Sequence, residues 1–187
     1  MPVSVTPDKF SLVAYDPDEI AATAADVAAR AGLPGGFDLV VEVIETSPMA
    51  TVKRTRLEAD GATLQMESGA FEDLKRPRCY SGRTASASFA RALYPVADLL
   101  DPDFGYDGPA DETELGIGLV SAWVTYALGR FANSGGPSHE GSARYHFRVH
   151  QGFSDAIDER FDELWAAERL DWQRLRTLAG LVSSAAS

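Results

Sequence analysis

Residues 49–68 read MATVKRTRLEADGATLQMES, and the alternation of apolar and polar side chains along them predicts a β-hairpin. We place its strands at Met49–Leu57 and Ala62–Ser68. The dipeptide Asp60-Gly61 between them is typical of a two-residue hairpin turn, because both residues tolerate the left-handed backbone that such turns need. This hairpin therefore anchors the predicted sheet.

The position of the turn also sets which residues of the two strands lie opposite each other. With the turn at Asp60-Gly61, Thr55 is expected opposite Met66 on the side that packs against the core. On the other side, Arg54 is expected opposite Glu67 as an exposed cross-strand ion pair. The arginines of this hairpin therefore have a structural explanation.

The elements on either side of the hairpin follow from periodicity and capping residues. Further strands are predicted at Phe10–Tyr15, Phe37–Glu45 and Arg144–His150. Helices are predicted after the capping residue Asp16, over Thr84–Leu100, in the apolar run after Leu115, and after the capping residues Ser154 and Asp171. This order indicates an α+β fold, with a mostly antiparallel sheet and helices packed on one face. We expect a single domain over 1–187, with 183–187 as a disordered tail.

Composition and charge exclude several classes of protein. The 187 residues carry a formal net charge of −11, which disfavours binding to nucleic acids and to anionic membranes. The longest charge-free apolar run, Leu115–Gly129, is too short for a membrane span and is expected to be a buried helix. A single cysteine, Cys79, excludes an internal disulfide. Because the N-terminus lacks the pattern of a signal peptide, we expect a soluble cytoplasmic protein.

The segment Arg144–His150 is one of two basic segments without acidic residues. On a strand its side chains alternate between two faces, so four basic side chains would share one face: Arg144, His146, Arg148 and His150. Tyr145, Phe147 and Val149 would then face the core. Arginine binds carboxylates and phosphates, and histidine adds a titratable donor. The alternative is that the acidic residues of the next helix pair with this face and hold it structurally.

The second basic segment, around Lys75–Arg91, contains Arg78 and Arg83 in or beside a predicted loop. The helix start near Thr84 would add backbone N–H groups that favour an anion. The alternative is a loop that only balances the acidic surface. Our hypothesis is that both basic segments converge on one cleft that binds an anion.

Catalytic and metal chemistry have little support in the sequence. Cys79 could pair with His146 or His150 as a nucleophile, but no motif supports such a pair. On a strand, His146 and His150 would lie about 13 Å apart at roughly 3.3 Å per residue, too far to share a metal ion. We therefore expect no metal and no cofactor.

The preferred function is a non-catalytic or regulatory protein that binds a small anionic ligand or an acidic segment of a partner through a basic cleft. The predicted ligand-binding residues are Arg78, Arg83, Arg144, His146, Arg148 and His150. One alternative is an enzyme on a phosphorylated or carboxylated metabolite, with a histidine as general acid–base. Another is a structural protein whose terminal helices pair subunits in a homodimer. The sequence leaves the choice between binding protein and enzyme open.

Overall fold

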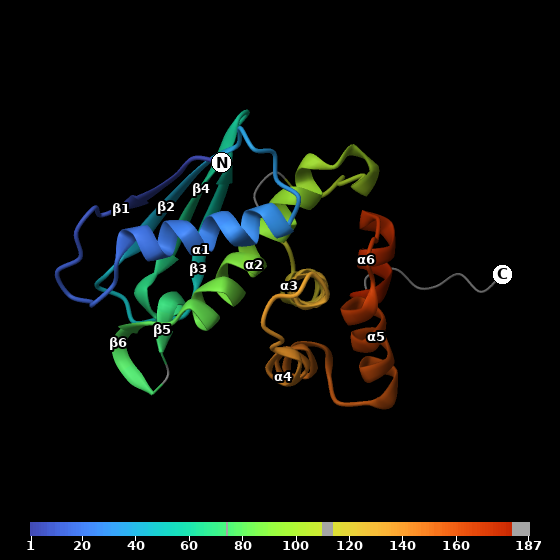
Figure 1. The fold of residues 1–187 in the computed structure, drawn as a ribbon. Coiled ribbons are helices and arrows are strands. Elements are labelled where there is room, and N and C mark those ends of the chain that lie inside the picture. The colour runs from blue at the N-terminus through green and yellow to red at the C-terminus, as the bar shows by residue number, and fades with distance from the viewer. Residues whose placement is uncertain (74, 110–113, 181–187) are drawn as a thin grey trace. The chain divides into compact units, whose positions relative to one another are not determined.

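The computed structural model describes residues 1–73, 75–109 and 114–180, and the predicted tail at 183–187 lies outside them. The chain divides into two compact units, Met1–Ala97 and Asp98–Ser187, which we call unit 1 and unit 2. Each unit is described by itself below, with its elements labelled in Figure 1. Whether the two units make one domain stays a prediction.

Unit 1 is built on a four-stranded mixed sheet in the order β1-β2-β4-β3. Its strands are β1 (Val3–Thr6), β2 (Asp38–Ile44), β3 (Val52–Leu57) and β4 (Gly61–Glu67). The β1–β2 and β2–β4 pairs are parallel, and only β3–β4 is antiparallel. The prediction of a mostly antiparallel sheet was therefore wrong, and α+β describes the chain only broadly. For β1–β2 the physical reason is the helix between them, because a helical crossover returns the chain in the same direction. For β2–β4 it is β3, which runs antiparallel at the edge of the sheet before the chain returns in β4.

That crossover helix is α1 (Pro17–Arg30), and its start is as predicted. Asp16 caps it by accepting a hydrogen bond from the Asp18 backbone N–H, with Pro17 in the first turn. The predicted strand at Phe10–Tyr15 was wrong, because the first strand is β1. Of the predicted segment, only Ala14 joins a β-bridge, with Cys79.

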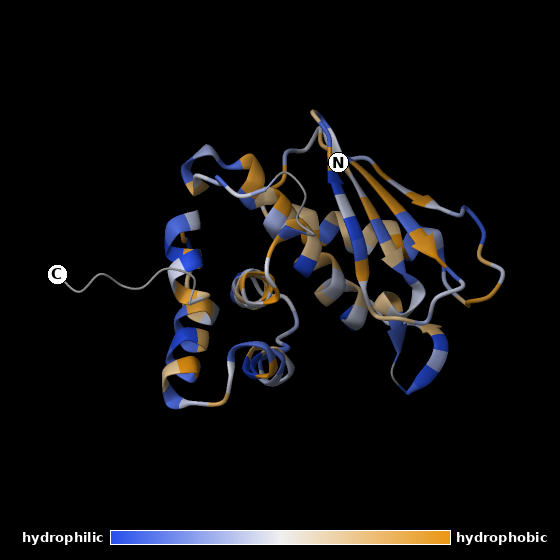
Figure 2. Ribbon diagram, turned by 180° about the vertical axis from the view of Figure 1, so that it is seen from behind, coloured by the Kyte–Doolittle hydropathy of each residue, from blue (hydrophilic) through white to orange (hydrophobic). Residues whose placement is uncertain are grey.

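The helices of unit 1 cover one face of its sheet, where alternate strand residues are buried. The buried strand residues include Leu39, Val41, Val43, Leu64 and Met66. Figure 2 shows the resulting alternation of apolar and polar residues along the strands, and Figure 1 shows α1 and α2 on one side of the sheet. In unit 1, α1 and α2 therefore lie on the same side of the sheet (Figure 1).

The β3–β4 hairpin forms, but its register differs from the prediction. Thr55 lies opposite Leu64 and Arg54 lies opposite Gln65, so the expected Arg54–Glu67 pairing was wrong. Thr55 and Arg54 keep their predicted faces, because the register there differs by two positions, and an irregularity between Val52 and Arg54 interrupts the alternation. The reason for Gly61 is packing: a Cβ there would lie 2.3 Å from the carbonyl oxygen of Asp38 on β2.

The rest of unit 1 leads from the sheet into a long helix. It consists of a 3-10 turn η1 (Ser68–Phe71), a short hairpin of β5 (Glu72–Asp73) and β6 (Arg76–Tyr80), and the helix α2 (Gly82–Leu100). The last residues of α2 belong to unit 2. Ser81 caps α2 by accepting a hydrogen bond from the Thr84 backbone N–H. Arg78 lies within β6, so the loop predicted around it was wrong.

Unit 2 is helical. It contains η2 (Pro102–Phe104), α3 (Ile117–Asn133), α4 (Glu140–Gln151), α5 (Asp155–Ala166) and α6 (Trp172–Leu178). Its core includes Trp123, Tyr126, Phe131, Phe147, Phe161, Leu164 and Trp172. Helices α3 and α5 approach closely, because a Cβ at Gly129 would lie 2.3 Å from the Trp165 carbonyl oxygen. Among the described residues, no helix has both the length and the apolar character needed to cross a membrane.

The segment Arg144–His150 lies within the helix α4, so the predicted strand was wrong. Only Ala143 and Phe147 of α4 are buried, and they are four residues apart, as one face of a helix requires. The alternation of polar and apolar residues over 144–150 has the period of a strand, whereas the buried pair Ala143 and Phe147 has the spacing of a helix. Packing of Phe147 against Phe161 of α5, with ring centroids 5.8 Å apart, selects the helix.

Candidate functional site

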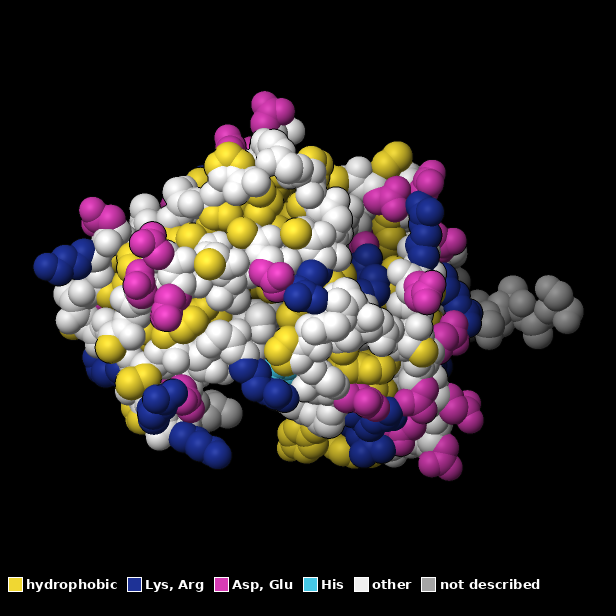
Figure 3. Space-filling view, viewed as in Figure 1, with side chains coloured by type: hydrophobic (Ala, Val, Ile, Leu, Met, Phe, Trp, Pro, Cys, Tyr) yellow, Lys and Arg dark blue, Asp and Glu magenta, His cyan; other side chains and the backbone are white. Residues whose placement is uncertain are grey.

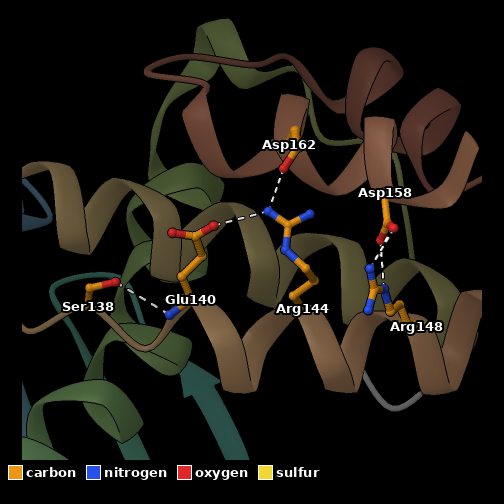
Figure 4. A network of polar contacts seen from close by, with 6 residues as sticks. All are labelled: Ser138, Glu140, Arg144, Arg148, Asp158 and Asp162. Carbon is orange, nitrogen blue, oxygen red and sulfur yellow. Dashed lines mark hydrogen bonds and ion pairs between the residues drawn. The ribbon is translucent and has the colours of Figure 1, made fainter. Parts of the chain in front are cut away.

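The helix α4 separates the four predicted basic residues into two pairs. Arg144 and Arg148 are partly buried and point toward α5 (Figure 4), while His146 and His150 are exposed. Residues at i and i+4 share one face of a helix, whereas a strand would have put all four on one face. The helix therefore removes the four-residue basic row that the strand implied.

Both arginines of α4 donate to carboxylates. Arg144 donates to Glu140 at 3.0 Å and to Asp162 of α5, and its guanidinium lies 4.1 Å from the centre of the Phe161 ring. Arg148 holds Asp158 of α5 in a two-pronged pair, with its Nε 2.7 Å from Oδ1. The hydrogen bond from Arg148 lowers the pKa of Asp158. The structural alternative for these arginines, pairing with the next helix, is confirmed.

His146 and His150 lie one helical turn apart on the exposed side of α4. Within the described residues, neither imidazole makes a hydrogen bond or ion pair, and His146 meets the edge of the Tyr145 ring with centroids 5.8 Å apart. Side chains at this spacing have Cβ atoms about 5–6 Å apart. The separation of 13 Å expected for a strand was therefore wrong.

Two large side chains that we expected in the core are exposed beside these histidines. Tyr145 is 60% exposed and Val149 is 51% exposed, although a strand would have turned both inward with Phe147. They are also one turn apart, so Tyr145, His146, Val149 and His150 form one continuous patch, which we call the α4 surface. The patch contains no carboxylate. Phe153, just beyond the helix, is 69% exposed.

A sequence signal for α4 was present and was missed. Glu140 lies in the first turn, Arg148 and His150 lie in the last turn, and Gly152 follows with φ of 111°. Acids at the start of a helix, bases at its end and glycine just after it are the pattern that the helix dipole and the terminal carbonyls favour. Read with Phe147, this pattern would have predicted the helix and the exposure of Tyr145.

Arg78 of unit 1 holds its own backbone and a neighbouring segment in place. Its guanidinium donates to the Leu12 carbonyl oxygen at 2.7 Å, and its backbone N–H donates to Glu72 at 2.8 Å. Its carbonyl oxygen accepts from the Ala14 backbone N–H. Arg78 also has φ of 61°, a left-handed conformation that is uncommon outside glycine. These contacts give Arg78 a structural role next to β6.

Arg83 is exposed in the first turn of α2, and Cys79 on β6 is half-buried. Both belong to unit 1, whereas α4 belongs to unit 2. The convergence of the two basic segments on one cleft, and a pairing of Cys79 with a histidine of α4, therefore stay predictions. Among the described residues, no group of three or more His, Cys, Asp or Glu side chains could hold a metal ion.

Acidic side chains are common on the surface of both units (Figure 3). In Figure 3, Asp and Glu side chains are spread over the visible face of each unit, and Lys or Arg side chains lie beside some of them. In comparisons of this chain with known proteins, no family model, no curated protein and no solved structure matches it.

Proposed function

We propose that the protein is a non-catalytic binding protein whose contact surface is the α4 surface, and that its occupant is a second copy of the chain. The observation that carries this proposal is the exposure of Tyr145 and Val149 side by side, on a patch without carboxylates. Contiguous exposed apolar side chains mark interaction surfaces, whereas single exposed apolar residues are common on any protein.

Charge supports a second copy at this place. Two chains that each carry −11 repel each other wherever acidic surfaces meet. The α4 surface brings no carboxylate to the contact, and the nearby charges of Arg144 and Arg148 are already balanced by Asp162 and Asp158. Two copies can therefore meet at α4 without placing acids opposite acids.

Symmetry supplies the complementary surface. In a two-fold contact, the same patch meets itself, so Tyr145 of one chain can pack against Val149 of the partner subunit in an antiparallel helix pair. An aromatic side chain buries roughly 150–250 Å² in full, so the α4 surface offers only a few hundred Å². A stable dimer buries about 800 Å² per partner. We therefore expect a weak dimer that dissociates on dilution.

Binding of a small anion, the function predicted from the sequence, has less support from the arginines. Arg144 and Arg148 already donate to carboxylates, and the Arg78 guanidinium donates to the Leu12 carbonyl oxygen. The histidines lie on an open helix surface, and an enzyme would need them in an enclosed pocket. Both features favour a contact surface over a catalytic site.

Analytical ultracentrifugation of the full chain from roughly 5 to 500 µM, at physiological salt, tests the proposal by spanning the range of weak association. We expect a monomer at the low end and a growing dimer fraction at the high end. Tyr145→Glu and Val149→Glu should each abolish the dimer, because they place acids in the contact.

Met49→Glu is the matched control for this experiment. It adds the same charge at an apolar side chain that is 60% exposed in unit 1, so it should leave the dimer unchanged. A wild-type chain that stays monomeric at the highest concentration would overturn the proposal. So would a loss of the dimer in Met49→Glu equal to that in the α4 variants.

A further inference from the structure

The pair His146 and His150 has the spacing of two ligands for one metal ion. Both lie on α4, four residues apart, so their Cβ atoms are about 5–6 Å apart on one face. Two imidazole nitrogens that start from this spacing can each reach a metal ion at about 2.0–2.1 Å. Two histidines at i and i+4 of a helix are a recurring way to hold zinc.

Both imidazoles are accessible for this chemistry. They are exposed, and within the described part of the chain neither is engaged in a hydrogen bond or ion pair. Metal ligation needs a neutral imidazole nitrogen with an available lone pair, and a partnered imidazole would first have to give up its contact.

The local charge also suits a cation. Arg148 lies between the two histidines in sequence, but its guanidinium is turned to Asp158 in a two-pronged pair, so its charge is balanced. His150 lies in the last turn of α4, where the unpaired carbonyl groups of the helix carry partial negative charge. A divalent ion at this end of the helix is therefore not repelled by its surroundings.

We infer that His146 and His150 form a two-imidazole site for a divalent transition-metal ion of the Cu²⁺, Ni²⁺ and Zn²⁺ class. Imidazole nitrogen selects these ions over Ca²⁺ and Mg²⁺, which prefer oxygen ligands. With two protein ligands, the site is weaker than a three- or four-ligand site, and water fills the other positions. The inference does not rest on the proposed dimer, because both ligands belong to one helix.

Isothermal titration of the untagged full chain with NiCl₂ and with ZnCl₂ tests the site. The protein concentration is kept at the dilute end, where the proposed dimer is dissociated, so the two proposals fail separately. We expect one ion per chain, and at least a tenfold loss of affinity in His146→Ala and in His150→Ala. CaCl₂ should give no binding.

A swap variant provides the matched control. Tyr145→His combined with His146→Tyr keeps the composition and exchanges two exposed positions, but it moves one imidazole about 100° around the helix. We expect this variant to lose affinity as much as the single alanine variants. Equal affinity in the swap variant and the wild type would overturn the inference, as would less than a twofold change in both alanine variants.

A second measurement separates a true site from a change in folding. A metal that binds only the folded helix raises the urea midpoint of unit 2, because binding to the native state stabilises it. All three tryptophans, Trp123, Trp165 and Trp172, lie in unit 2, so their fluorescence reports this unit. NiCl₂ should raise the midpoint of the wild type and not that of the swap variant; equal shifts in both would contradict the site.

Discussion

Arg78 and Arg148 lie in the two basic segments of the chain, and their guanidinium groups have different kinds of partner. Arg78 donates to a main-chain carbonyl oxygen, that of Leu12. Arg148 donates through two nitrogens to the carboxylate of Asp158 on α5. A carbonyl oxygen satisfies a donor but leaves the positive charge in place, whereas a carboxylate satisfies the donor and balances the charge.

This difference shows why a count of basic residues does not locate a binding surface. Both segments are free of acidic residues in sequence, yet α4 acquires three carboxylate partners through folding, from Glu140, Asp158 and Asp162. In the segment around Arg78, Arg76 pairs with the carboxylate of Asp73, and the Arg78 backbone N–H donates to Glu72. The Arg78 guanidinium itself donates only to a main-chain carbonyl oxygen, that of Leu12, among the contacts described. The surface that α4 exposes to a partner is therefore made of apolar side chains and imidazoles, because the charges of its arginines are already balanced.

The largest expected effect tests what anchors the α4 segment. Phe147→Ala should lower the free energy of unfolding of unit 2 by about 3–5 kcal/mol, because Phe147 is fully buried against Phe161. Tyr145→Ala and Val149→Ala should change it by less than about 0.5 kcal/mol, because both side chains are exposed. Urea unfolding followed by tryptophan fluorescence measures all three. If Phe147→Ala and Tyr145→Ala lowered the free energy of unfolding by similar amounts, residues 144–150 would be better described as a strand than as a helix.

A smaller loss in the free energy of unfolding is expected at Tyr15, which packs against β6, the strand that contains Arg78. Tyr15 is buried, its hydroxyl donates to the Ser68 carbonyl oxygen at 2.8 Å, and its ring meets the edge of Tyr80. Tyr15→Phe removes this hydrogen bond and should cost about 1 kcal/mol at neutral pH. Urea unfolding followed by far-UV circular dichroism measures the loss.

The cost of Tyr15→Phe should also depend on pH. Burial raises the pKa of Tyr15 from 10 to about 12. As pH rises from 10 toward 12, the unfolded chain loses this proton while the folded chain keeps it, so the wild type loses stability, by on the order of 1–2 kcal/mol. The phenylalanine variant lacks this loss, so the difference between the two proteins should shrink between pH 9 and pH 11. If the difference in the free energy of unfolding between the two proteins stayed constant from pH 9 to pH 11, the raised pKa of a buried Tyr15 hydroxyl would be contradicted.

The smallest effect is expected at the ion pair that balances the charge of α4. The pKa of Asp158 is lowered by Arg148, so the pair stabilises unit 2 above the ordinary carboxylate pKa of about 3.9 and this contribution disappears as pH falls through the lower folded value. Asp158→Asn should lower the urea midpoint slightly at pH 7. In acid, the midpoints of the wild type and of this variant should become equal. Glu159→Gln, at an exposed neighbour on α5, is the control and should show no such convergence.

The start of α1 and the start of α5 were predictable because their causes are local. Asp16 caps α1 by accepting from Asp18, and Ser154 caps α5 by accepting from Ile157, so each cap depends on atoms within three residues. The same holds for the β3–β4 hairpin from Arg54 to Leu57, where the alternation of side chains gave the faces of Arg54 and Thr55.

Contacts between distant segments were not predictable in this way. The close approach of β4 to Asp38 of β2 requires Gly61, and the parallel pairing of β1 with β2 depends on the path of α1. The alternation of Arg144–His150 alone favours a strand, and only the charge pattern of its ends and Gly152 indicate a helix. Its structure is selected by Phe161, Asp158 and Asp162 on α5, because the burial of one ring and the pairing of two arginines favour the helix. Local hydrogen bonds can be read along the chain, whereas these partners come together only when the chain folds.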